Sequence, residues 1–127
     1  MAALFTDSFN MRQVAGPSTR LDLTGVYFSM AAPSPVPVTL EPHLVVLLRC
    51  PPDEQGNGVL ETVYRRDGEQ VARNAQPVTV EPGRFGYRLV RAELVFEDYG
   101  TVEAHVRLDQ GHTTIVPLTL LPPTGDN

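Results

Sequence analysis

The chain has 127 residues, a formal net charge of −5, and 42% apolar against 20% charged residues. This length fits one compact domain, and this apolar fraction excludes both a disordered acidic chain and a membrane span. The ten glycines and twelve prolines are too many for a helical bundle and are typical of short strands joined by turns.

The basic residues are all arginine, and only Arg65 and Arg66 are adjacent. Nucleic acids and anionic membrane surfaces bind clustered cations, so we expect no nucleic-acid partner and no membrane insertion. Cys50 is the only cysteine. The first residues, MAALFTD, lack the basic flank and long apolar run of a signal peptide, so we expect a cytoplasmic protein.

The first third of the chain predicts strands, because no stretch shows a capped 3.6-residue apolar pattern. We expect a short strand over residues 3–7, then an irregular connection over 11–17 that turns at Gly16-Pro17. A strong strand follows over 21–30. Gly25 interrupts it and indicates a bulge or a close backbone approach.

Residues 31–42 contain four prolines, at positions 33, 35, 37 and 42. Proline lacks the N–H donor and fixes φ, so we expect an extended connection, similar to polyproline II, that crosses from one sheet to the other. The apolar run that follows is typical of a central strand covered on both faces, here over 43–50. Pro51-Pro52 ends this strand.

The dipeptide Asp67-Gly68 predicts a two-residue hairpin turn of type I′, since both central positions of that turn need positive φ. Such a turn would pair Arg66 with Glu69 and Tyr64 with Val71. It joins strands over 59–66 and 69–72, and further strands are expected over 77–80 and 87–97.

The last two strands form a hairpin, with apolar residues on one face of 101–108 and the turn at Gln110-Gly111-His112. A three-residue loop places both apolar sets on the same face. The predicted pairs are Leu108 with Thr114, Val106 with Val116 and Ala104 with Leu118.

Seven or eight strands with turns about a dozen residues apart predict an all-β fold, an antiparallel sandwich. We expect a single domain over residues 1–121 and a flexible tail over 122–127. The stretch 94–106, LVFEDYGTVEAHV, resembles the approach to strand F of immunoglobulin-like sandwiches, in which an Asp and a Gly shape the corner. Asp98, Gly100 and Ala104 match that pattern, whereas Val102 stands where the pattern has a tyrosine.

The whole chain is also similar to small bacterial proteins of the DUF6941 family, whose function is unknown. The similarity lies in an opening ALFTD strand, an LDLTG strand, an apolar middle strand, the Asp67-Gly68 hairpin and a closing hairpin with Tyr99-Gly100 and Leu108-Asp109. This resemblance implies a bacterial β-sandwich and supplies no catalytic residues.

The residues with catalytic or metal-binding chemistry are scattered. Glu103, His105, Asp109 and His112 lie near the final hairpin and are the only candidates for a metal site. An ordinary solvated strand face explains them as well. His43 is expected to be a partly buried structural histidine, and Cys50 a buried, inert thiol. We therefore expect no enzyme and no cofactor.

Three functions remain in view, and the first is preferred. It is a non-catalytic module that binds another protein or self-associates, through a sheet edge or through the loops at 31–42 and 110–112. The predicted contact residues are Pro35, Pro37, Tyr87, Tyr99, Gln110 and His112. The second is a small-ligand or carbohydrate-binding sandwich with Tyr87, Arg88 and Arg91 along a groove. The third is a metal-dependent enzyme that uses His105 and His112.

Overall fold

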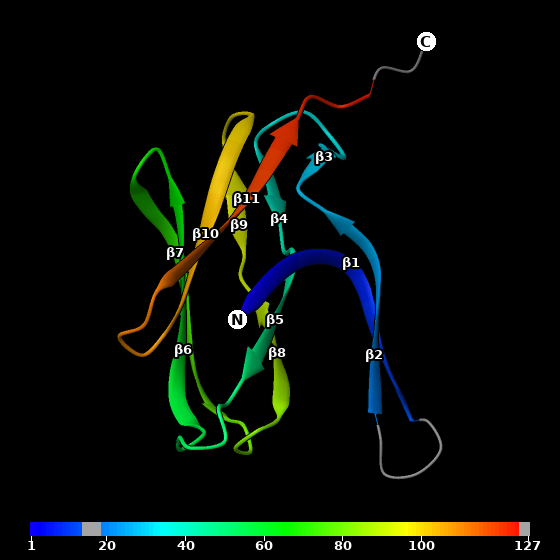
Figure 1. Ribbon diagram of the computed structural model, residues 1–127. Coiled ribbons are helices and arrows are strands. Elements are labelled where there is room, and N and C mark those ends of the chain that lie inside the picture. Colours follow the sequence, from blue (N-terminus) through cyan, green and yellow to red (C-terminus); the bar gives the residue numbers. More distant parts are fainter. Residues whose placement is uncertain (14–18, 125–127) are drawn as a thin grey trace.

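The protein is described by a computed structural model that covers residues 1–13 and 19–124, and no helix occurs within this part (Figure 1). It contains eleven strands: β1 (Ala2–Gln13), β2 (Thr19–Tyr27), β3 (Ser29–Ala31), β4 (Val38–Leu40), β5 (His43–Arg49), β6 (Asn57–Arg66), β7 (Glu69–Thr79), β8 (Phe85–Arg91), β9 (Leu94–Phe96), β10 (Gly100–Leu108) and β11 (Thr113–Leu121). The all-β expectation is confirmed, but the expected seven or eight strands are too few.

The strands form two main sheets and one short ribbon. One sheet has the order β2-β1-β5-β8, the other has the order β3-β11-β10-β6-β7, and β4 pairs with β9. The pairing is antiparallel except between β3 and β11, which run parallel. The expectation of a purely antiparallel fold is therefore wrong, because β3 reaches the edge of the second sheet by a crossover from β2 rather than by a hairpin.

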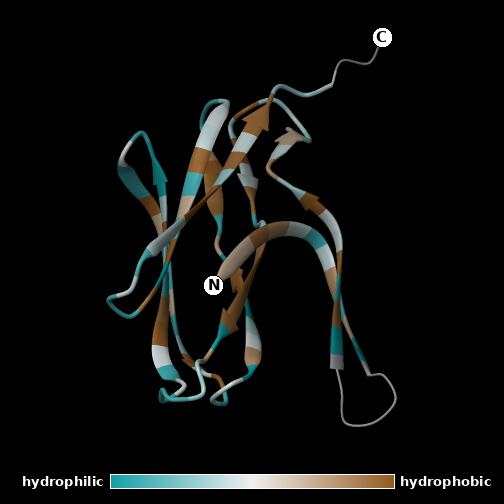
Figure 2. Cartoon of the chain, in the orientation of Figure 1, coloured by the Kyte–Doolittle hydropathy of each residue, from teal (hydrophilic) through white to brown (hydrophobic). Residues whose placement is uncertain are grey.

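One hydrophobic core is shared by both sheets. Its largest fully buried side chains are Tyr64, Phe5 and Phe96. Burial alternates along β10 and β11, and Figure 2 shows the corresponding bands of apolar and polar residues. Central strand β5 is buried on both faces, as its apolar run predicts: Leu44 and Val46 face the core, and Val45 between them is 1% exposed.

Two expected long strands are each divided in the structure. The strand expected over 21–30 becomes β2 in one sheet and β3 in the other, and the strand expected over 87–97 becomes β8 and β9. The β4–β9 ladder has the same register as the β5–β8 ladder, since Leu40 opposes Leu94 and His43 opposes Arg91. The break falls at Pro42, which has no N–H to donate. Alternation alone does not reveal such breaks, because the side chains keep their faces across a bend.

The β6–β7 hairpin confirms the predicted turn and corrects its register. Asp67 has φ 51° and Gly68 has φ 81°, and Arg66 opposes Glu69. Tyr64, however, opposes Ala72 rather than Val71, because the register shifts between Tyr64 and Arg65. Val71 is therefore the extra residue of a β-bulge. The expected strands over 69–72 and 77–80 are parts of the single strand β7.

The β10–β11 hairpin keeps the predicted faces but not the predicted pairs. Val106 opposes Thr114 and Ala104 opposes Val116, two residues away from the expected register. Asp109 adopts φ 50°, and the N–H of Gly111 donates to the carbonyl of Leu108 at 2.9 Å. The turn therefore begins before Gln110, the first residue of the predicted loop. A shift of two residues leaves each side chain on its face, so the apolar pattern could not detect it.

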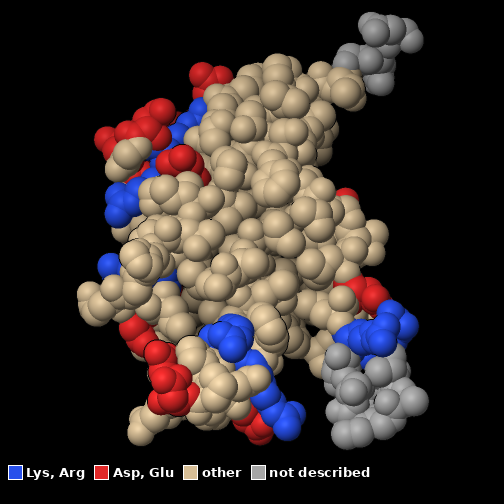
Figure 3. Space-filling model, viewed as in Figure 1, with Lys and Arg blue, Asp and Glu red and all other residues tan. Residues whose placement is uncertain are grey.

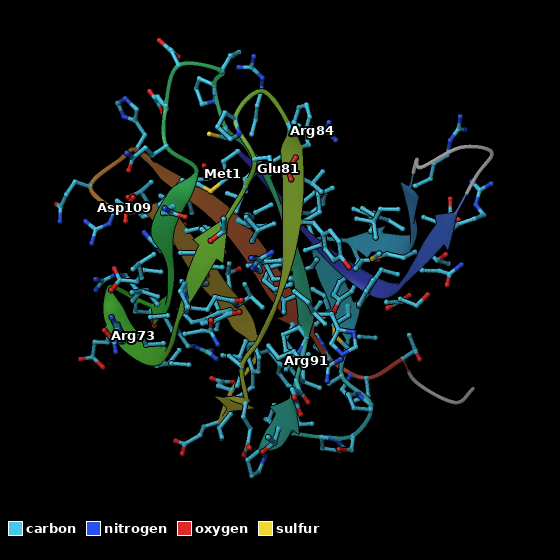
Figure 4. All side chains as sticks on the ribbon, turned by 90° about the horizontal axis from the view of Figure 1, so that it is seen from below. Met1, Arg73, Glu81, Arg84, Arg91 and Asp109 are labelled. Atoms are coloured by element: carbon cyan, nitrogen blue, oxygen red, sulfur yellow. The ribbon has the colours of Figure 1, made fainter. Side chains whose placement is uncertain are left out.

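Strand β1 is twelve residues long, not the short strand expected over 3–7, and the expected connection over 11–17 is strand as far as Gln13. The predicted Gly16-Pro17 turn lies outside the described residues. Strand β1 pairs with β5 only over Ala2–Thr6, while its pairing with β2 continues to Gln13. We call residues 8–13 and 19–24 the β1–β2 arm, which extends away from the other strands when the molecule is seen from below (Figure 4).

At the base of the arm, the register between β1 and β2 is the same on both sides of Gly25. The expected bulge is therefore absent from this described pair. Gly25 has φ 67°, and the carboxylate of Asp7 occupies the place where a Cβ would stand. The close approach that the glycine predicted is made by a side chain rather than by backbone.

Candidate binding groove

The predicted contact residues do not form one surface. Pro35 and Pro37 are exposed in the connection between β3 and β4. Tyr99 follows β9 and packs against the core. Gln110 and His112 are exposed in the turn at the other end of β10. Tyr87 lies on β8, and it is the one that the structure places in a groove.

The groove lies between the β1–β2 arm and the outer face of β5 and β8. Its volume is about 410 Å³, and its lining consists of Met11, Arg20, Leu21, Leu47, Phe85, Gly86, Tyr87 and Arg88. Figure 3 shows the hollow between the lower end of the arm and the body of the molecule. The groove lies between two neighbouring strand pairs of the same sheet, β2-β1 and β5-β8, because the arm curls away from the plane of the sheet.

The arm presents an apolar face to this groove. Phe9 opposes Leu23, and Met11 opposes Leu21. These four side chains share one face of the hairpin, because residues two apart on a strand point the same way. The hydroxyl of Tyr87 contacts Sδ of Met11, which fixes the direction in which this face points.

The opposite wall is apolar and open to solvent. Leu47 and Tyr87 are cross-strand partners on β5 and β8. Phe85, at the start of β8, is 75% exposed, the largest exposed fraction among the exposed large apolar side chains. Such exposure of a phenylalanine beside other apolar groups is unusual for a side chain that has no binding role.

The charges around the groove are positive. Arg20 and Arg88 line it, and no carboxylate does so within the described part of the chain. Arg88 Nη1 donates to the carbonyl of Tyr87 at 2.8 Å. On the arm, Arg12 donates two hydrogen bonds to Asp22, and this pairing lowers the pKa of the Asp22 carboxyl. The charge of Arg12 is thus compensated, whereas Arg20 and Arg88 form no salt bridge with any described residue.

The alternative ligand-binding set is only partly assembled. Tyr87 and Arg88 line the groove, but Arg91 lies at the other end of β8, where it opposes His43.

His43 is half-buried at the start of β5, as expected. Cys50 is 5% exposed, and its thiol donates to the carbonyls of Pro51 and Glu54.

The candidate metal residues are not gathered into a site. His105 Nε2 lies 3.3 Å from Glu103 Oε1 on the outer face of β10, whereas His112 is exposed in the turn. Asp109 Oδ1 instead accepts a hydrogen bond from the N–H of Val59 at 2.9 Å. Across residues 1–13 and 19–124, no three His, Cys, Asp or Glu side chains are placed to hold a metal ion.

Nearby, the same outer face carries an ion-pair network. Glu61 accepts from Arg73 at 2.7 Å and from Arg107 at 3.0 Å. Hydrogen bonding from Arg73, with the charges of Arg73 and Arg107, lowers the pKa of Glu61. This network joins β6, β7 and β10. Its three charged residues thus have a structural role, the linking of neighbouring strands.

Sequence reasoning missed Phe85, Met11 and Leu21. The alternating apolar residues at 9, 11, 21 and 23 were a usable signal, because they predict a hairpin with one apolar face.

No family model, no curated protein and no solved structure matches this chain. None of the described residues forms a helix that could cross a membrane.

Proposed function

We propose that this chain is a non-catalytic protein-protein interaction or self-assembly module, and that its contact surface is the groove of the β1–β2 arm. This replaces the loops at 31–42 and 110–112 as the preferred surface. The proposal includes a cytoplasmic location, an immunoglobulin-like sandwich and kinship with the DUF6941 proteins. The corner at Asp98-Tyr99-Gly100 supports the sandwich, since Asp98 Oδ1 accepts from the N–H of Tyr99 at 2.8 Å.

The observation that carries the proposal is the exposure of Phe85 opposite the apolar face of an arm. A two-stranded hairpin is marginally stable unless its apolar face is covered. A partner that fills the groove would bury Phe85 together with Met11 and Leu21. Burial of apolar surface stabilises by about 25 cal/mol per Å², so the exposed groove is a favourable place for association.

The test compares the wild-type protein with Phe85→Ser. Phe85 is so exposed that its loss should leave the fold intact. Phe28→Ser is the matched control, because Phe28 is 50% exposed and lies outside the groove. Light scattering after size exclusion, and capture from the native lysate, should show an association that Phe85→Ser loses and Phe28→Ser keeps. A monomer without partners, or equal capture by all three proteins, would count against the proposal.

A second candidate function is binding of a small ligand or a carbohydrate in the same groove. The observation that favours it is the placement of Tyr87 beside Arg88, since aromatic and cationic side chains stack on and hydrogen-bond to such ligands. A thermal-shift panel of sugars and metabolites tests it. Stabilisation by one compound that Tyr87→Ser abolishes would favour a ligand over a protein partner.

A further inference from the structure

A second hollow lies at the opposite end of the molecule and carries the opposite charge. Its volume is about 560 Å³, and we call it the acidic tip. It is lined by Arg66, Asp67, Val71, Glu93, Val95, Glu97 and Asp98. In Figure 3 a group of acidic residues, with arginines among them, lies at the upper left, near the β6–β7 hairpin, and the arm lies at the lower right.

The one cation of the acidic tip is engaged by backbone. Arg66 donates to the carbonyl of Asp98 at 2.9 Å and to that of Tyr99 at 2.6 Å, and its guanidinium lies 5.7 Å from the centre of the Phe96 ring. The four carboxylates that line the tip form no salt bridge with described residues. With four carboxylates and one guanidinium, the lining of the tip carries a net negative charge.

The acidic tip is also partly apolar. Val95 is 55% exposed and Val71 is 46% exposed. Val71 is the extra residue of the β-bulge in β7, and that irregularity places a branched apolar side chain among carboxylates. Exposed apolar groups beside an excess of charge of one sign favour a docking surface that is selected by charge.

We propose that the acidic tip of one copy packs against the arm groove of a second copy, so that the chain assembles head to tail. The exposed valines would contact Phe85, Met11 and Leu21. The carboxylates around them would face Arg20 and Arg88, the two cations of the groove, neither of which forms a salt bridge with a described residue. This inference rests on the proposed function and names its partner as another copy of this chain.

The two surfaces lie at opposite ends, so one contact leaves a free groove on one copy and a free acidic tip on the other. Such a heterologous contact adds further copies, into a ring if the rotation closes and into an open chain if it does not. Attraction between arginines and carboxylates speeds association and is screened by salt within about 10 Å at 0.1 M ionic strength. The length of the assemblies should therefore increase with protein concentration and decrease with salt.

The experiment is sedimentation velocity of the purified full chain at low and high salt. The double variant Arg20→Glu/Arg88→Glu reverses the charge of the groove. The double variant Glu93→Arg/Glu97→Arg reverses the sign of two charges at the tip. Arg20→Glu alone is the second groove variant, because Arg20 is exposed on the arm and its replacement should leave the fold intact. Arg91→Glu, on the same strand as Arg88 but outside the groove, and Glu54→Arg, in the exposed loop before β6, are the matched controls.

Wild type and both controls should assemble at low salt, and each reversal should weaken self-association about tenfold or more, since facing like charges cost more than about 1.4 kcal/mol. A mixture of the groove variant with the tip variant should restore association, because the first keeps its tip and the second keeps its groove. If instead two copies met through identical patches, mixing the two variants would not be expected to restore association. Restoration in the mixture therefore distinguishes the head-to-tail contact from a symmetric one.

A purified chain that stays monomeric at low salt would overturn the inference, and so would reversals with no effect. Either result leaves the proposed function standing if a different protein is captured and Phe85→Ser loses it. If Phe85→Ser loses nothing, the proposed function fails as well.

Discussion

The buried hydroxyl of Tyr64 provides the sharpest test of the core. Tyr64 is fully buried, and its hydroxyl has no hydrogen-bond partner among the described residues. The neighbouring core residue Thr62 has the same property at Oγ1. We therefore expect Tyr64→Phe to stabilise the protein, although nearly all substitutions of a fully buried tyrosine destabilise.

The magnitude follows from two opposing effects. A buried hydroxyl without a partner costs about 1–3 kcal/mol. Removal of one oxygen leaves a void smaller than a methyl group, which costs less than about 1 kcal/mol. The net gain is about 1 kcal/mol, or about 4 °C in Tm for a domain of this size. Thr62→Val replaces the hydroxyl by a methyl of the same shape, and its gain should be equal or larger.

Urea unfolding followed by far-ultraviolet circular dichroism measures both variants. Tyr99→Phe is the control, because Tyr99 is half-buried at the rim of the core, and its free energy of unfolding should change by less than about 0.5 kcal/mol. A loss of more than about 1 kcal/mol in Tyr64→Phe would refute the reasoning, because it would mean that the hydroxyl is hydrogen-bonded in solution.

Three further predictions concern charge and backbone conformation. Burial raises the pKa of Tyr64, so the folded state keeps the hydroxyl proton at pH values where the unfolded chain loses it. The free energy of unfolding is therefore independent of this group below about pH 10 and falls above it by about 1.4 kcal/mol per pH unit. Tyr64→Phe should flatten that decline in urea titrations. Gly100→Ala should lower the free energy of unfolding by about 1–3 kcal/mol, because Gly100 has φ 137°, a backbone conformation that alanine rarely adopts. Urea unfolding measures the loss, and an unchanged midpoint would contradict this. Arg73 lowers the pKa of Glu61, so Glu61→Gln should destabilise at neutral pH, and the difference from wild type should vanish as the pH falls through the lowered pKa. A difference that persists in acid would show that packing, not charge, is responsible.

Features set by adjacent residues could be predicted from the sequence. The Asp67-Gly68 turn is local, since two positive φ values determine it. The buried β5 strand is marked by its own apolar run. The outcome was different where a feature depends on distant pairing. The bend at Pro42 and the two-residue register shift of the last hairpin preserve side-chain alternation, which is the signal that the prediction used. The bulge at Val71 breaks the alternation, but it lies where residues 69–71 are all exposed, so no apolar pattern marks it.

The candidate groove was harder to predict for a related reason. Tyr87 and Arg88 could be named because they are aromatic and basic, but Met11 and Leu21 resemble ordinary core residues in sequence. Only the curl of β1 away from β5 after Thr6 turns them toward Phe85. The direction of a hairpin relative to its sheet is a tertiary property that periodicity does not contain.

The pairing order also constrains how the chain reaches its native state. Strand β3 pairs with β11, β4 with β9, and β5 with β8, so each sheet interlaces segments from both halves of the polypeptide. A nascent chain on the ribosome cannot complete its first sheet until β8 has emerged, or its second until β11 has emerged, and long-range pairing of this kind is slow. A cut in the exposed segment 52–55 would leave a first fragment without β8 and a second fragment without β3, and it would separate β4 from β9, so the complete sheets form only when the two fragments recombine.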